Sequence, residues 1–193
     1  MHAFAVVLVP AGTEDVLQAV THILSFSDSN KEVEPHKVYL SNDLLRIWSE
    51  MYGIPITDLS DLAERMNEES KTIYEIDKGG IFCITTSNYQ GQWDYWVIGG
   101  RWDGVIQGKS RNTKGRSNYG PEHEQWQYNI CPVSGLHADV LPVVVVTPDG
   151  RWHEMECQSL DPTDEEAERW RAILRPLLEQ YHDCIAVGVD THL

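Results

Sequence analysis

Short apolar runs open and close the chain, and helical patterns lie between them. Residues 3–9 and 184–189 are continuous apolar runs, which predicts two buried strands. Polar residues at 27–35 predict a loop. Four stretches repeat apolar residues every three or four positions, which predicts amphipathic helices: 16–24, 42–51, 58–69 and 167–181.

The remaining strand patterns lie in the middle and late parts of the chain. They cover residues 81–86, 94–98, 102–106, 141–147 and 151–157. Because helices and strands do not alternate strictly, a doubly wound parallel sheet is disfavoured. We predict an α+β fold in which helices pack on a mixed or antiparallel sheet. The length of 193 residues favours a single domain over residues 1–193, or at most one domain with an inserted subdomain.

The charge of the chain limits its partners. Fifteen Lys and Arg residues stand against thirty Asp and Glu residues, which gives a formal charge of −15. Such a chain is a poor general coat for nucleic acid, because phosphate binding needs a cationic surface. No apolar run reaches membrane-spanning length, and the first residues lack the basic region of a signal peptide. We expect a cytoplasmic protein that does not enter membranes.

The cysteines suggest no disulfide framework. Cys83, Cys131, Cys157 and Cys184 include no C-x-x-C pair. Cys83, Cys131 and Cys184 lie directly beside apolar residues, and we expect four buried free thiols.

The segment at residues 93–104, WDYWVIGGRWDG, interrupts a strand pattern with two glycines followed by an arginine. One explanation is a β-bulge. The other is a ligand site in which the backbone of Gly99 and Gly100 and the side chain of Arg101 bind an anion. Trp96 and Trp102 would then stack on a planar group, as in a nucleotide-like ligand.

A basic cluster follows this segment in a region rich in Gly, Ser and Asn. Lys109, Arg111, Lys114 and Arg116 lie in the predicted flexible loop at 108–120. The loop is either a solvated surface segment or a clamp, in which Lys109 and Arg111 contact a polyanion or an acidic protein partner. It is also the one local feature that favours nucleic acid.

Histidines and carboxylates late in the chain suggest a metal site. Asp190 and His192 point to the same face of an extended strand. His153 lies in the predicted hairpin, next to Glu154. Together, His153, Asp190 and His192 have the chemistry to bind a divalent metal such as Zn or Mn, and His2 could join them. The alternative is that these histidines only make hydrogen bonds.

Three motifs in order carry a resemblance to known sequences: WDYWVIGGRW at 93–102, VVTPDGRWHE at 145–154 and AVGVDTHL at 186–193. The chain resembles a group of uncharacterised proteins from bacteria, especially actinobacteria, and their phages. The resemblance implies a bacterial or phage setting. It supplies no activity.

Three functions follow from these patterns. The first is a small accessory protein that binds an anionic, nucleotide-like small molecule or a protein partner near Arg101. The second is a metal-dependent phosphoesterase, with His153, Asp190 and His192 as ligands and Glu154 as general base. The third is an acidic mimic of nucleic acid, with the helix start at 161–168 on its contact face.

Overall fold

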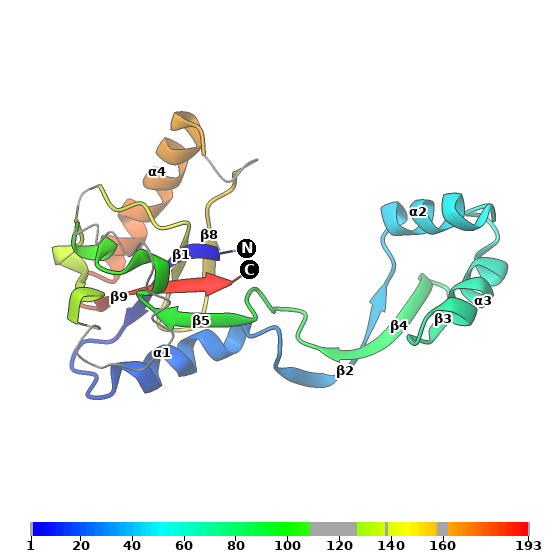
Figure 1. Cartoon of the computed structure of the whole chain (residues 1–193), viewed down its shortest axis with the longest axis horizontal. Coiled ribbons are helices and arrows are strands. Elements are labelled where there is room, and N and C mark those ends of the chain that lie inside the picture. Colours follow the sequence, from blue (N-terminus) through cyan, green and yellow to red (C-terminus); the bar gives the residue numbers. More distant parts are fainter. Residues whose placement is uncertain (1, 109–126, 138, 158–161, 193) are drawn as a thin grey trace. The chain divides into compact units, whose positions relative to one another are not determined.

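The computed structural model describes residues 2–108, 127–137, 139–157 and 162–192 (Figure 1). The chain forms two compact units. Met1–Lys31 and Tyr89–Leu193 make the first unit, and Glu32–Asn88 make the second. The second unit is therefore an insertion in the sequence of the first. The basic loop predicted at 108–120 lies outside the described residues, except for Gly108.

A six-stranded mixed sheet forms the centre of the first unit. Its strands are β1 (His2–Val9), β5 (Tyr95–Ile98), β6 (Ile130–Pro132), β7 (Val144–Val146), β8 (Trp152–Glu154) and β9 (Ile185–His192). The order is β5-β9-β1-β7-β8, and β6 also pairs with β9. Only β1 and β7 run parallel among these pairs. The two long apolar strands thus lie side by side, as their continuous hydrophobicity requires.

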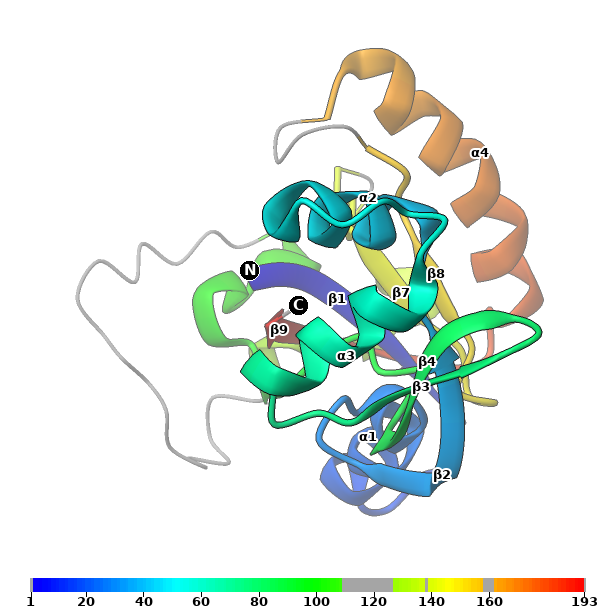
Figure 2. The same cartoon turned by 90° about the vertical axis from the view of Figure 1, so that its right-hand side faces the viewer.

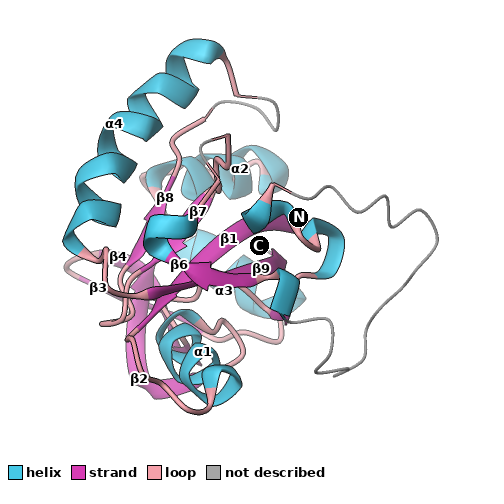
Figure 3. Cartoon of the chain, turned by 90° about the vertical axis from the view of Figure 1, so that its left-hand side faces the viewer, coloured by secondary structure: helices cyan, strands magenta, loops and turns pink. Residues whose placement is uncertain are grey.

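Helices cover both faces of this sheet (Figure 3). On one face, α1 (Val16–Leu24) packs on Val7 and Val187. On the other face, α4 (Asp164–Gln180) packs on Val6 and Val145. Because side chains alternate along a strand, β1 needs apolar residues at every position to contact both helical layers.

The second unit is a three-stranded antiparallel sheet with two helices (Figure 2). Its strands β2 (Glu32–Tyr39), β3 (Tyr74–Asp77) and β4 (Gly80–Ser87) follow the order β2-β4-β3. Its helices are α2 (Asn42–Tyr52) and α3 (Leu59–Glu69). Leu62, Met66 and Ile81 are at the centre of a small core of their own.

The predicted α+β fold with mixed or antiparallel sheets is confirmed. Two local predictions were wrong. Residues 102–106 do not continue a strand, because positive φ angles at Gly99, Gly100 and Gly104 turn the chain into the short 3-10 helices Gly100–Trp102 and Val105–Gln107. The predicted loop at 27–35 contains the start of β2, an edge strand whose polar residues hid it.

Candidate functional site

The Gly-Gly-Arg segment is a close-packed turn at the end of β5. Gly99 has φ +75° and Gly100 has φ +55°, a region that favours glycine. A Cβ atom on Gly100 would lie 2.5 Å from the Cβ of Asp190, and one on Gly99 would lie 2.5 Å from Nδ2 of Asn129. Both glycines are therefore needed for packing within the first unit.

The anion at this turn is a carboxylate of the chain itself. The backbone N–H of Arg101 donates to Oδ2 of Asp190 at 3.0 Å. The second oxygen, Oδ1, lies 2.9 Å from Nδ1 of His2. Asp190 is only 2% exposed. The sequence predicted that the backbone of Gly99 and Gly100 and the side chain of Arg101 bind an external anion. In the structure, the N–H of Gly99 donates to the carbonyl oxygen of Gly188, and the Arg101 side chain is exposed.

A second histidine–carboxylate pair lies beside the first. His192 stands opposite His2 across β1 and β9, and the ring centroids are 5.1 Å apart. Nδ1 of His192 lies 2.7 Å from Oδ1 of Asp94. These two pairs therefore form one cluster of two imidazoles and two carboxylates at the start of β1 and the end of β9. These two strand ends lie side by side (Figure 1).

The two tryptophans predicted to wall one pocket lie on opposite faces of the sheet. Trp96 packs in the cluster on the α1 face. Trp102 packs on the α4 face, with its ring 5.8 Å from that of Phe4. The structure does not bring them together around one ligand.

The three residues predicted to bind a metal are not brought together either. Asp190 and His192 lie on β9, but His153 lies on β8, and strands β1 and β7 separate the two. Glu154 accepts a hydrogen bond from Nε1 of Trp152 at 3.2 Å. Within the described residues, no group of three or more His, Cys, Asp or Glu side chains is arranged to hold a metal ion. The metal-dependent hydrolase stays a prediction.

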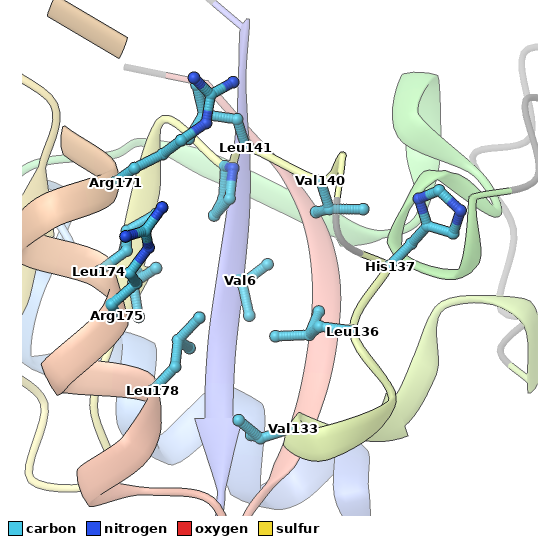
Figure 4. A pocket seen from close by; sticks show the side chains of 12 residues that line it. Val6, Val133, Leu136, His137, Val140, Leu141, Arg171, Leu174, Arg175 and Leu178 are labelled. Carbon is cyan, nitrogen blue, oxygen red and sulfur yellow. The ribbon is translucent and has the colours of Figure 1, made fainter. Parts of the chain in front are cut away.

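A hollow lies between α4 and the central sheet (Figure 4). This α4 hollow has a volume of about 280 Å³. Val6 of β1 and Val145 of β7 form its floor, and Leu174 and Leu178 of α4 form one wall. The opposite wall comes from the segment around Leu136, and the remaining lining residues are Val133, His137, Val140, Leu141, Pro142, Arg171 and Arg175. Most of the lining side chains are apolar, and the polar ones are His137, Arg171 and Arg175.

Two arginines border this apolar space. Arg171 and Arg175 extend from α4 on the side of the hollow near Leu141 (Figure 4). Arg171 forms a surface ion pair with Glu168 at 2.6 Å. Arg175 has no ion pair with any residue in the described part of the chain. Two positive charges beside an apolar cavity favour the binding of an amphipathic anion.

A second hollow, of about 420 Å³, adjoins the first. This Trp102 hollow shares His137, Val140 and Leu141 with the α4 hollow, and Phe4 and Trp102 form its other side. Nε1 of Trp102 is buried and donates to no atom of the described residues. Buried N–H groups without a partner are rare in folded proteins, so this one marks the Trp102 ring as an unusual part of the wall.

Two charged segments were predicted as contact surfaces, the basic loop and the acidic helix start. Lys109 and Arg111 lie outside the described residues. In the acidic helix start, Glu166 completes a capping box with Thr163, and Glu165 pairs with Arg169. Glu168 pairs with Arg171, so the acidity of this helix start is partly neutralised. The mimic function stays a prediction.

Comparisons with family models, curated proteins and solved structures found no match to this chain. The resemblance to bacterial and phage proteins stays a prediction. In the described part of the chain, no helix is both long and apolar enough to cross a membrane.

Arg171 and Arg175 were not predicted from the sequence as binding residues. The signal was present in their spacing, because 171, 174, 175 and 178 follow the i, i+3, i+4, i+7 pattern of one helix face. Two arginines on the same helix face as two leucines indicate that this apolar face borders a positively charged region. The opposite wall, at residues 133–137 and 139–141, has no comparable sequence pattern.

Proposed function

We propose that this protein binds a small organic anion with an apolar body, and that the α4 hollow is its binding site. The observation that carries the proposal is the α4 hollow itself, where leucine and valine side chains line the interior and Arg171 and Arg175 stand at the edge. Ligand pockets are commonly apolar cavities with a few polar groups that fix the orientation of the ligand.

The apolar interior and the two arginines make different contributions to binding. Burial of the ligand's apolar body in the α4 hollow contributes about 0.8 kcal/mol per CH₂ group. The arginines select for a carboxylate or phosphate, since guanidinium groups match these anions with paired hydrogen bonds. Arg171 can exchange its exposed partner Glu168 for a ligand at little cost, because surface ion pairs contribute about 0–1 kcal/mol.

The size of the cavity sets the scale of the ligand. About 280 Å³ suits a compact molecule such as a medium-chain carboxylate. The adjoining Trp102 hollow adds an aromatic wall, which supports a planar extension of the same ligand. A nucleotide-like ligand near Arg101, in a bacterial or phage accessory protein, stays the prediction of the sequence.

The test compares octanoate with 1-octanol by calorimetry on the full chain. The two molecules share a carbon chain and differ in charge. We expect octanoate to bind more tightly. Arg175→Met keeps an aliphatic stem but removes the charge, so it should weaken octanoate about tenfold or more, in line with the 1.5–3 kcal/mol of a charged hydrogen bond. Its effect on octanol should be small.

Arg169→Met is the matched control, because Arg169 lies on the same helix, pairs with Glu165 and does not line the α4 hollow. It should leave octanoate binding unchanged. Equal loss in both variants, or no octanoate binding by the folded wild-type protein, would contradict the proposal. Binding of a fluorescent mant-nucleotide that is lost in Arg101→Met and kept in Arg175→Met would instead favour the nucleotide site at Arg101.

A further inference from the structure

His2 at the start of β1 and His192 at the end of β9 form a pair of histidines whose exposure and hydrogen bonds a structural role does not require. His2 and His192 face each other across the two strands. Their side chains are 21% and 40% exposed, so both rings reach solvent from the edge of the unit. Burial therefore does not account for two imidazoles at adjacent positions.

Carboxylates fix the tautomer of both rings. Nδ1 of His2 lies 2.9 Å from Asp190, and Nδ1 of His192 lies 2.7 Å from Asp94. A carboxylate accepts a hydrogen bond, so Nδ1 carries the proton in each ring and the lone pair of the neutral ring is on Nε2. No described residue bonds to either Nε2 atom. Metal-binding histidines usually have this arrangement, with an outer carboxylate on the second nitrogen.

The separation of the rings also suits a shared metal ion. Tetrahedral zinc holds imidazole nitrogens at about 2.0–2.1 Å, which places the centres of two bound rings about 5 Å apart. The centroids of His2 and His192 are 5.1 Å apart. Asp190 is held in turn by the N–H of Arg101, so the outer shell is anchored in the Gly-Gly-Arg turn.

We infer that Nε2 of His2 and Nε2 of His192 bind one divalent transition metal ion, with Asp190 and Asp94 as the outer carboxylates that orient the rings. This assignment replaces the predicted ligand set, because Asp190 acts through His2 and His153 takes no part. Two protein ligands leave the other coordination positions to water or to an anion. The site is independent of the α4 hollow.

The test is a titration of the full, untagged chain with cobalt(II), followed by its visible ligand-field absorption, and then displacement by zinc. We expect one equivalent to bind. His192→Ala should abolish the signal, and so should His2→Ala. Asp94→Asn should weaken binding about 10–100-fold, the usual effect of losing an outer carboxylate. Asp94 suits this test better than Asp190, because it is exposed and supports no backbone turn.

His153→Ala is the matched control, since His153 belongs to the same sheet but lies three strands away from β9. It should leave binding unchanged. Long-range ¹H–¹⁵N spectra of the imidazoles give a second measurement, in which zinc should shift Nε2 and not Nδ1 of both rings. Cobalt binding no stronger than in the His2→Ala/His192→Ala double variant would overturn the inference. An equal loss in His153→Ala, or an unchanged signal in His192→Ala, would overturn it too.

Discussion

Two strands of equal length show how differently the two units are built. Both β1 and β2 have eight residues. In β1, seven positions are buried, and helices pack on both sides of its sheet. In β2, no position is buried, and the strand carries Glu32, Glu34, Pro35 and Lys37 at the edge of a three-stranded sheet. Charged residues and proline are common on edge strands, where they discourage pairing with other chains.

The comparison extends to the cores. Of the thirteen large apolar side chains exposed among the described residues, nine belong to the unit at 32–88. On α2, Leu45 is buried against α3, while Leu44, Ile47 and Met51 are exposed. A unit with few buried apolar contacts opens at lower free energy than one with a continuous core. We therefore expect the unit at 32–88 to unfold locally before the six-stranded unit.

Truncation of one core residue in each unit should cause the greatest loss of stability. Trp170→Ala removes a ring that is 3% exposed and whose Nε1 donates to the carbonyl oxygen of Pro142, so it should cost about 3–5 kcal/mol of unfolding free energy. Leu62→Ala should cost about 2–5 kcal/mol, felt by the unit at 32–88. Hydrogen exchange read by mass spectrometry checks both. Faster exchange throughout the chain in Leu62→Ala would contradict the separation of the two units.

Glycine-to-alanine substitutions at two turns, one in each unit, give the next effect in size. Gly100→Ala brings a Cβ atom within 2.5 Å of Asp190, so we expect a loss above the usual cost of about 1–2 kcal/mol for an alanine at positive φ. Gly53→Ala, at the end of α2, meets open space and should cost only that backbone term. Chemical denaturation measures both. Equal losses would show that Asp190 does not pack against the turn.

Helix caps give a smaller effect. Thr163 caps α4 through a reciprocal capping box with Glu166, whereas Ser41 caps α2 through one bond from the N–H of Leu44. Thr163→Ala and Ser41→Ala should each cost about 1 kcal/mol, with the larger loss at Thr163, where two bonds are removed. Thermal unfolding compares them, and a larger loss at Ser41 would contradict this order.

The smallest effect is chemical and concerns the cysteines of the six-stranded unit. Burial raises the pKa of the Cys131 thiol, so its reactive thiolate forms only at higher pH, and its alkylation should be slow at neutral pH and rise steeply as the pH increases. Cys157 is exposed and should react first with iodoacetamide. Mass spectrometry of the labelled peptides gives the order. Early labelling of Cys131 would indicate that its packing against β9 opens readily.

Much of this fold is predictable because its signals are local. The apolar run at 3–9 and the helix patterns at 42–51 and 58–69 appear in the structure nearly as predicted. Strand β2 escaped prediction because an edge strand has no apolar face to bury. The expectation of four buried thiols was wrong, since only Cys131 is buried and Cys157 is exposed.

The candidate sites were less predictable because they depend on strand order. The sequence places Asp190 and His192 on one strand face, but it does not show that β1 is their neighbour and that β8 is three strands away. It also does not show that Gly100 lies against Asp190. The α4 hollow needs the wall formed by residues 133–137 and 139–141, whose position follows from tertiary packing alone.

The most direct test of anion binding observes the arginines themselves. Nε–Hε resonances of the arginine side chains are recorded by NMR while octanoate is added to the full chain. The signals of Arg171 and Arg175 should shift in a saturable manner, and the signal of Arg169 should stay in place, because only the first two border the α4 hollow. If all three shift alike, or if none shifts while octanoate binds elsewhere, the α4 hollow is not the binding site.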